Sequence, residues 1–160
     1  MSIDKRDFDI IIWGASGFTG RLVAEYLCQN YSPNELKWAI AGRDANKLNK
    51  IRDQYLNEKI PIIIADSFDE VSLNKMTKRT KVICTTVGPY AKYGSFLVKS
   101  CVSSKTHYCD LAGEAQWIRK MIDLHHEDAR DNNLRIVNSC GFDSIPSDLG
   151  VYYIHKNISK

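Results

Sequence analysis

Three glycines at intervals of three residues separate an apolar run from a run with helical spacing near the start of the chain. They are Gly14, Gly17 and Gly20, within IIIWGASGFTGRLVAEYL, residues 10–27. Glycine in regular structure costs about 0.5–1 kcal/mol relative to alanine, so this spacing indicates a tight turn whose backbone must stay bare. A helix N-terminus binds phosphate through free N–H groups and a favourable dipole, and a Cβ atom would block that approach. The stretch predicts a strand–turn–helix unit that binds a dinucleotide, with a plain tight turn as the alternative.

The rest of the chain alternates between two kinds of segment. Apolar runs of the length expected for strands buried on both faces lie at Phe8–Trp13, Leu36–Ala41, Ile60–Ala65, Lys81–Thr86, Thr106–Asp110 and Leu134–Asn138. Helical spacing lies at Thr19–Asn30, Ala45–Tyr55, Phe68–Thr77, Ser95–Ser103 and Ala115–Asn132. This alternation predicts an α/β protein with a Rossmann-type, doubly wound parallel sheet of about six strands in the order 3-2-1-4-5-6.

Composition excludes several other classes. The 160 residues are 44% hydrophobic, which is enough for one domain with a real core. The net charge of +3 comes from dispersed lysines and arginines, so no nucleic-acid surface is indicated. Five cysteines without a C-x-x-C pair, together with four scattered histidines, predict reduced thiols, a cytoplasmic protein and no metal site. The polar N-terminus MSIDKRDFD does not have the pattern expected of a signal peptide, and no apolar run approaches the roughly 20 residues that span a bilayer.

The end of the second predicted strand indicates which dinucleotide binds. An NAD site places an acidic residue there to hold the ribose 2′-hydroxyl. This chain instead has Gly42 followed by Arg43, and an arginine can pair with a 2′-phosphate in a bidentate way. Lys47, one helical turn further, can add positive charge. NADP is therefore favoured; the alternative is that Arg43 is solvated and paired with Asp44.

Two further strand ends are predicted to line the same site. Asp66 follows the third strand and can accept a hydrogen bond from the adenine amino group, or it can cap the helix that starts near Phe68. Val87, Gly88 and Pro89 follow the fourth strand, beside the topological switch point. Small or rigid residues suit close backbone approach, so these three are predicted to pass beneath the nicotinamide half of the cofactor.

Five segments together resemble the saccharopine dehydrogenase-like oxidoreductases, a family that includes trans-acting enoyl reductases. The segments are GASGFTGRLVAEYL, AGRDANKL, TTVGPYAKYGSFLVKSCV, THYCDLAGE and VNSCGFDSIPSDLG. The resemblance implies an NADP-binding Rossmann domain of an oxidoreductase that transfers hydride to a small or lipid-linked unsaturated substrate. Carried over to this chain, the pyrophosphate would be held by the glycine turn, the 2′-phosphate by Arg43 and the nicotinamide side by Val87–Pro89. The residues of the turn are Gly14, Ser16, Gly17, Phe18, Thr19 and Gly20.

The resemblance also implies a domain organisation. Residues 1–150 would form the NADP-binding domain, and residues 151–160 would begin a substrate and dimerisation domain that this sequence does not contain. A chain of this extent is expected to bind NADPH without useful turnover and to self-associate through the surface meant for that second domain. The competing class is a non-catalytic nucleotide-binding module.

Polar residues that follow the fifth and sixth strands have two interpretations. Tyr108, Asp110 and Glu114 are candidates for substrate contact, but Asp110 or Glu114 can instead cap the helix that starts near Ala115. Asp143 or Ser144 can cap a helix that begins around Pro146.

A short-chain dehydrogenase triad is the rival catalytic hypothesis. Tyr152 and Lys156 are four residues apart on a predicted helix, and Ser139 ends the preceding strand. In such a triad the lysine lowers the tyrosine pKa so that the tyrosine acts as a general acid. The active-site strand of those enzymes is normally the fifth, whereas Ser139 ends the sixth. The catalytic residues are therefore left unassigned.

Overall fold

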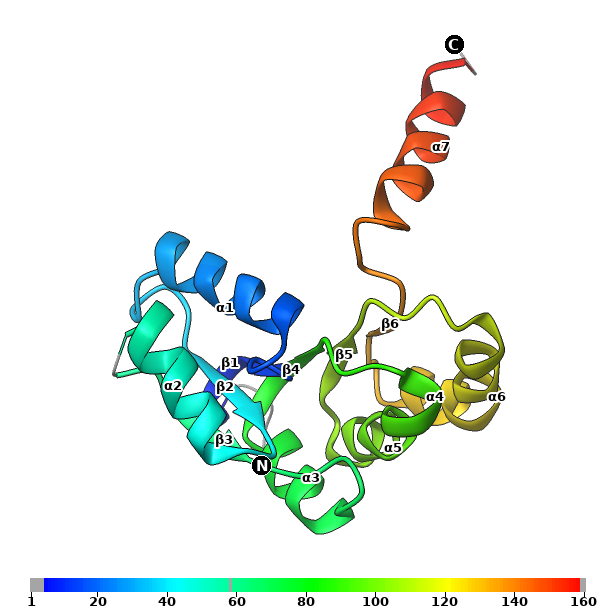
Figure 1. Cartoon of the computed structure of the whole chain (residues 1–160). Helices are drawn as coiled ribbons and strands as arrows, with labels where there is room; N and C mark the ends of the chain where they lie inside the picture. The colour runs from blue at the N-terminus through cyan, green and yellow to red at the C-terminus, as the bar shows by residue number, and fades with distance from the viewer. Residues whose placement is uncertain (1–4, 58, 159–160) are drawn as a thin grey trace.

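The chain folds around one six-stranded parallel sheet in the order β3-β2-β1-β4-β5-β6, as predicted (Figure 1). The computed structural model describes residues 5–57 and 59–158. The strands are β1 (Phe8–Trp13), β2 (Trp38–Gly42), β3 (Ile62–Ile64), β4 (Thr80–Thr85), β5 (His107–Cys109) and β6 (Ile136–Val137). The helices are α1 (Phe18–Asn30), α2 (Ala45–Tyr55), α3 (Glu70–Thr77), α4 (Tyr90–Tyr93), α5 (Ser95–Ser104), α6 (Ala115–Asp131) and α7 (Ile145–Ile158). Residues 1–4, the start of the polar N-terminal stretch MSIDKRDFD, lie outside the described residues.

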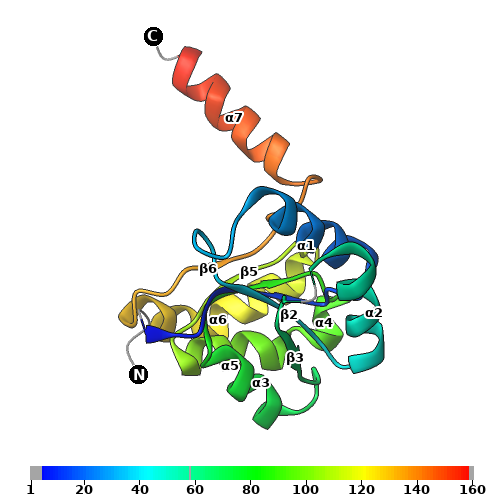
Figure 2. The same ribbon diagram turned by 90° about the vertical axis from the view of Figure 1, so that its left-hand side faces the viewer.

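Two apolar cores lie on the two faces of the sheet. Ile11 and Trp13 of β1 pack with α3, α5 and α6, whereas Ile12 packs with α1 and α2. Successive strand side chains point to opposite faces, so a continuous apolar run such as FDIIIW can fill both cores at once. Figure 2 shows the two helical layers with the sheet between them. This is the doubly wound arrangement that the alternation of segments predicted.

The elements differ from the sequence predictions mainly in length and in one omission. The predicted strand at Leu36–Ala41 begins two residues later, at Trp38, and the strand at Leu134–Asn138 is reduced to Ile136–Val137. The helix α4 was not predicted, because four residues between Pro89 and Gly94 are too few to show helical periodicity.

Helix α7 stands away from the rest of the molecule (Figures 1 and 2). It has no buried residue, and it exposes apolar side chains that include Val151 (70% exposed) and Tyr153 (69%). Pro146 lies in its first turn, where the fixed φ of proline is favourable. The boundary predicted at residue 150 falls inside this helix. In the described part of the chain, no helix is both long and apolar enough to cross a membrane.

Candidate functional site

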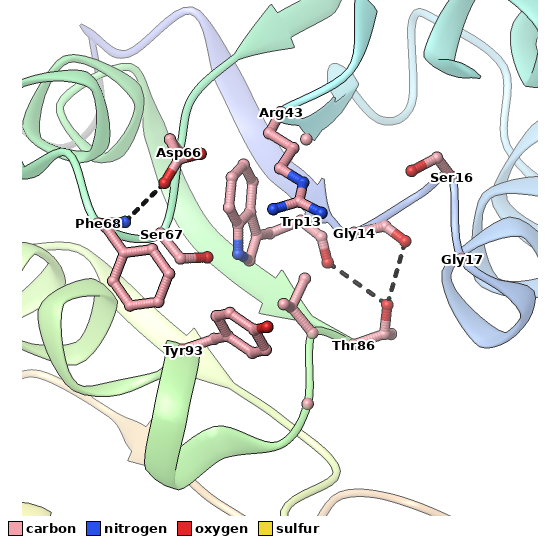
Figure 3. Close-up of a pocket in the computed structure, with 13 residues that line it drawn as sticks. Trp13, Gly14, Ser16, Gly17, Arg43, Asp66, Ser67, Phe68, Thr86 and Tyr93 are labelled. Atoms are coloured by element: carbon pink, nitrogen blue, oxygen red, sulfur yellow. Dashed lines mark hydrogen bonds between the residues drawn. The ribbon is translucent and has the colours of Figure 1, made fainter.

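A pocket of about 370 Å³ lies at the carboxyl ends of β1–β4 (Figure 3). This edge is where doubly wound sheets bind ligands, at the point where the strand order reverses. Its lining residues are Trp13, Gly14, Ser16, Gly17, Gly42, Arg43, Asp66, Ser67, Phe68, Thr86, Val87, Gly88 and Tyr93. We call it the strand-end pocket. Of the predicted cofactor residues, it brings together Gly14, Ser16, Gly17, Arg43, Asp66, Val87 and Gly88.

The first two glycines of the turn form one side of this pocket for different reasons. Gly14 has φ +91°, and a Cβ atom there would lie 2.5 Å from Val87 Cγ2, so a side chain is excluded by both conformation and space. Gly17 is the N-cap residue of α1, and no side chain caps that helix. The first-turn N–H groups of α1 are thus free of a side-chain cap where an anionic group could approach them.

The third glycine, Gly20, is required for close packing of α1 against the glycine turn. Gly20 is buried, and a Cβ atom on it would lie 2.2 Å from the Gly14 carbonyl oxygen and 2.7 Å from Thr86 Oγ1. Gly20 therefore lets α1 start close against the turn, and it does not line the strand-end pocket. Thr19 and Pro89 also lie outside that lining. Phe18 lines a neighbouring groove and is 76% exposed.

Arg43 points into the strand-end pocket from the end of β2 (Figure 3). The predicted alternative, an ion pair between Arg43 and Asp44, is not formed among the described residues. Asp44 instead caps α2 by accepting a hydrogen bond from Lys47 N at 3.0 Å. The Lys47 side chain lines the neighbouring groove, which shares Ser16 and Gly17 with the strand-end pocket. Arg21 and Lys50 line the same groove as Lys47, so several positive charges lie around the glycine turn.

Asp66 has a local partner and still lines the pocket. Its Oδ1 atom accepts a hydrogen bond from Phe68 N at 2.8 Å (Figure 3). It does not cap α3, because that helix begins at Glu70 and its N-cap is Asp69, which accepts from Val71 N at 2.9 Å. The alternative predicted for Asp66, capping of the following helix, is therefore wrong: the cap is Asp69, three residues further along the chain.

An aromatic wall was missed by sequence reasoning. Phe68 and Tyr93 lie with their ring centroids 5.5 Å apart on one side of the pocket (Figure 3). Trp13 lies beneath and is only 2% exposed. Phe68 ends the stretch IIIADSF and Tyr93 ends the stretch VGPYAKY, so each follows a predicted strand end closely in the sequence. This closeness was the only sequence signal that could have placed them at the pocket.

Thr86 and Val87 connect the glycine turn to the end of β4. Thr86 Oγ1 donates to the carbonyl oxygens of Trp13 and Gly14 at 3.4 and 3.5 Å. The following segment is anchored by Tyr90, whose hydroxyl donates to Thr85 O at 3.2 Å. Burial raises the pKa of Tyr90 to about 12, so this donor keeps its proton throughout the physiological range.

Asp110, which directly follows β5, is buried and its carboxylate is bonded within the protein. Asp110 is 1% exposed and accepts hydrogen bonds from four donors. These donors are the Tyr108 hydroxyl (2.8 Å), Ala112 N (3.0 Å), Asn138 Nδ2 (2.7 Å) and Ser139 N (3.0 Å). The carboxylate therefore ties the loop after β5 to the loop after β6, and it does not cap α6, whose N-cap residue is Glu114.

Glu114 caps a different helix from the one predicted. It is the N-cap residue of α6 but makes no side-chain bond there. Its two carboxylate oxygens accept from Tyr90 N (2.6 Å) and Ala91 N (2.8 Å), at the start of α4. Glu114 thereby fixes the segment that carries Gly88 and Tyr93 along the pocket.

The three residues of the rival triad are not assembled. Ser139 has φ +59°, and its hydroxyl donates to Ala112 O at 2.7 Å. Tyr152 is 60% exposed on the projecting helix α7, where Lys156 Nζ lies 5.9 Å from its ring centroid. Within the described residues, no group of three or more histidine, cysteine or acidic side chains is placed to hold a metal ion.

The sheet order and the strand-end pocket define a Rossmann-type dinucleotide-binding domain. Residues 10–137 match the family of the saccharopine dehydrogenase NADP binding domain. The chain belongs to this family of NADP-binding domains.

Longer proteins resemble the chain over nearly all of its length. It is 43% identical over 160 residues to the trans-acting enoyl reductase of Mycobacterium leprae, covering 99% of this chain and 38% of that protein. It is 41% identical over 162 residues to the enzyme of the same name from Mycobacterium ulcerans, covering 100% of this chain and 38% of that protein. The chain thus spans 38% of the length of these relatives.

Solved structures share the fold at low sequence identity. Saccharopine dehydrogenase (L-Glu forming) from Saccharomyces cerevisiae superposes with a TM-score of 0.71 at 17% identity, over 93% of this chain and 32% of that one. Triphenylmethane reductase from Citrobacter sp., solved in complex with NADP(H), gives a TM-score of 0.59 at 18% identity, over 81% of this chain and 48% of that one.

Proposed function

We propose that the strand-end pocket binds NADPH and that the chain is the cofactor-binding part of an oxidoreductase which reduces a small or lipid-linked unsaturated substrate. The observation that carries this proposal is the meeting of three features in one pocket. These are the bare turn Gly14–Gly17, the N-terminus of α1 without a side-chain cap, and the guanidinium of Arg43. Membership of an NADP-binding family supports the assignment.

Each part of the cofactor has a matching group in the chain. The pyrophosphate is assigned to the residues of the turn and of the first turn of α1, namely Ser16, Gly17, Phe18 and Thr19, with Gly14 and Gly20 permitting the close approach. Arg43 pairs with the 2′-phosphate through a charge-assisted hydrogen bond. Asp66 is assigned as the hydrogen-bond acceptor for the adenine amino group. Val87, Gly88 and Pro89 are assigned to the nicotinamide side, and Val87 and Gly88 line the strand-end pocket.

The activity belongs to the longer protein. Relatives named trans-acting enoyl reductases support reduction of a carbon–carbon double bond. NADPH supplies the hydride, and the protein supplies binding and orientation. Hydride transfer requires the reacting atoms to be held about 3–3.5 Å apart, which needs a second wall over the open strand-end pocket.

Helix α7 supports a two-domain organisation. Its unburied apolar residues suit the start of a substrate and dimerisation domain that follows residue 150. We expect the 160-residue chain alone to bind NADPH, to turn over no substrate at a useful rate, and to form homo-oligomers. The five free cysteines support a cytoplasmic location.

The test is cofactor selectivity in titration calorimetry. Arg43→Ala should weaken NADPH binding by about 1.5–3 kcal/mol, which is roughly a tenfold to hundredfold loss, and leave NADH binding nearly unchanged. Arg52→Ala is the matched control, because Arg52 is an arginine of α2 that pairs with Asp53 and does not line the pocket. An equal loss for both cofactors in Arg43→Ala would refute the 2′-phosphate assignment.

Turnover distinguishes the proposed fragment from a complete enzyme. NADPH absorbance is followed with enones, ketones and imines as substrates, and we expect no decrease above the background rate. Efficient turnover by the 160-residue chain would contradict the need for a second domain. It would also restore Ser139, Tyr152 and Lys156 as catalytic candidates.

A further inference from the structure

Two cysteines on adjacent strands are directly opposite one another. Cys84 of β4 is the register partner of Cys109 of β5. The neighbouring pair, Ile83 and Tyr108, is buried in the core formed with α3, α5 and α6. Because strand side chains alternate between faces, both cysteines point to the opposite face, where Cys84 contacts the other core.

Much of this face is uncovered in the described part of the chain. Helices α1 and α2 pack over β1–β3, whereas Figures 1 and 2 show no helix lying over β5 and β6 on that side. Val137 of β6, on the same face, is 48% exposed. Cys84 and Cys109 are both partly exposed.

The two thiols influence each other's ionisation. A hydrogen bond from Cys109 lowers the pKa of Cys84, against the opposing effect of burial. The same hydrogen bond, burial and the charge of Cys84 all raise the pKa of Cys109. The two thiols therefore lie close enough for one to act as nucleophile and the other as its resolving partner.

We propose that Cys84 and Cys109 are a modification site at which peroxide forms a disulfide between β4 and β5. Adjacent strands lie about 4.8 Å apart, within the range of about 4.4–6.8 Å that Cα atoms of a disulfide require. The site lies two residues before Thr86, which bonds to the glycine turn. It is independent of whether a dinucleotide binds.

The reaction takes place in two balanced steps. The thiolate of one cysteine, here Cys84, attacks one oxygen of hydrogen peroxide, the O–O bond breaks, and hydroxide leaves, so that this cysteine becomes a sulfenic acid. This product is neutral, which removes the hydrogen bond to a thiolate and the charge that raise the pKa of Cys109. Cys109 then loses its proton and attacks Cys84 Sγ, and the S–O bond breaks with release of the sulfenic oxygen as water. Overall, two thiols and one peroxide give one disulfide and two waters.

Peptide mapping of the peroxide-treated chain tests the proposal. Free thiols are alkylated under denaturing conditions, and the intact mass and the linked peptides are measured. We expect a product about 2 Da lighter before alkylation, with Cys84 and Cys109 in one linked peptide pair. Cys84→Ser and Cys109→Ser should each abolish this product. Cys28→Ser, a partly exposed cysteine on α1, is the control that should retain it.

Mapping of the wild-type chain decides the matter even if a variant fails to fold. The proposal is overturned if Cys84 and Cys109 both remain alkylatable after treatment. It is equally overturned if the linked pair contains Cys140, whose thiol lies in the loop after β6 and affects the pKa of Cys84.

Discussion

Replacing Gly20 with alanine tests whether this glycine allows α1 to pack against the glycine turn or contacts NADPH directly. The added Cβ would lie 2.2 Å from Gly14 O and 2.7 Å from Thr86 Oγ1, whereas ordinary contacts begin at 3.4 Å. The nearest atom is backbone, so α1 must move by about an ångström away from the turn. Overpacking of this kind costs about 1–3 kcal/mol, and the better helix propensity of alanine returns about 1 kcal/mol. We expect a net loss of about 1 kcal/mol, which lowers Tm by about 2–4 °C in a domain of this size.

Thermal unfolding followed by circular dichroism measures this change. Gly150→Ala is the matched control, because Gly150 lies within α7 and a Cβ atom there meets nothing within 4 Å. The control should leave Tm unchanged or raise it slightly. If Gly20→Ala keeps the wild-type Tm but loses NADPH binding, Gly20 contacts the ligand directly and the packing argument is refuted.

Three further predictions follow from single contacts. Gly17→Val should abolish NADPH binding in calorimetry, because the branched side chain fills the approach to the α1 N-terminus, while circular dichroism should still report a folded domain. Retained binding would show that the turn has only a structural role. Asp110→Ala should lower the free energy of unfolding, measured in urea, by at least about 3 kcal/mol, because the Tyr108 hydroxyl and three other donors lose their acceptor. A loss under about 1 kcal/mol would contradict this. Hydrogen bonds from Lys81 and from Lys37 N hold the pKa of Asp9 below its usual value of 3.8, so its stabilisation is present above that value and is lost as pH falls through the folded-state pKa. Asp9→Asn should therefore destabilise the chain at pH 7 and match the wild type in strong acid, and an equal difference at both pH values would contradict the linkage.

Sequence reasoning predicted the sheet because local patterns decide it. Short apolar runs separated by helical spacing allow few connections, and right-handed crossovers leave the order that is observed. The turn Gly14–Gly17 was identifiable for the same reason, since its conformational requirement is expressed by the residues themselves. Both features depend on neighbours in the chain.

The missed features depend on contacts between distant segments. One predicted alternative for Glu114 was to cap the helix beside it, yet it accepts bonds from Tyr90 and Ala91, which are 24 and 23 residues away. Phe68 and Tyr93 meet on one side of the strand-end pocket only because β3 and β4 are placed around β1. Short-range rules for caps and turns cannot choose among such partners, because the sheet must form before they come close.

Chemical-shift mapping with NADPH tests the central claim most directly. Backbone amide resonances of the ¹⁵N-labelled chain are followed during titration. The account predicts that the largest shifts occur at the strand-end pocket, in the turn Gly14–Gly17 and at Arg43, Phe68 and Gly88. A groove of about 410 Å³ at the opposite, amino-terminal edge of the sheet, lined in part by Trp38, is the internal control and should not respond. Largest shifts at that groove, or none anywhere at saturating NADPH, would contradict the account.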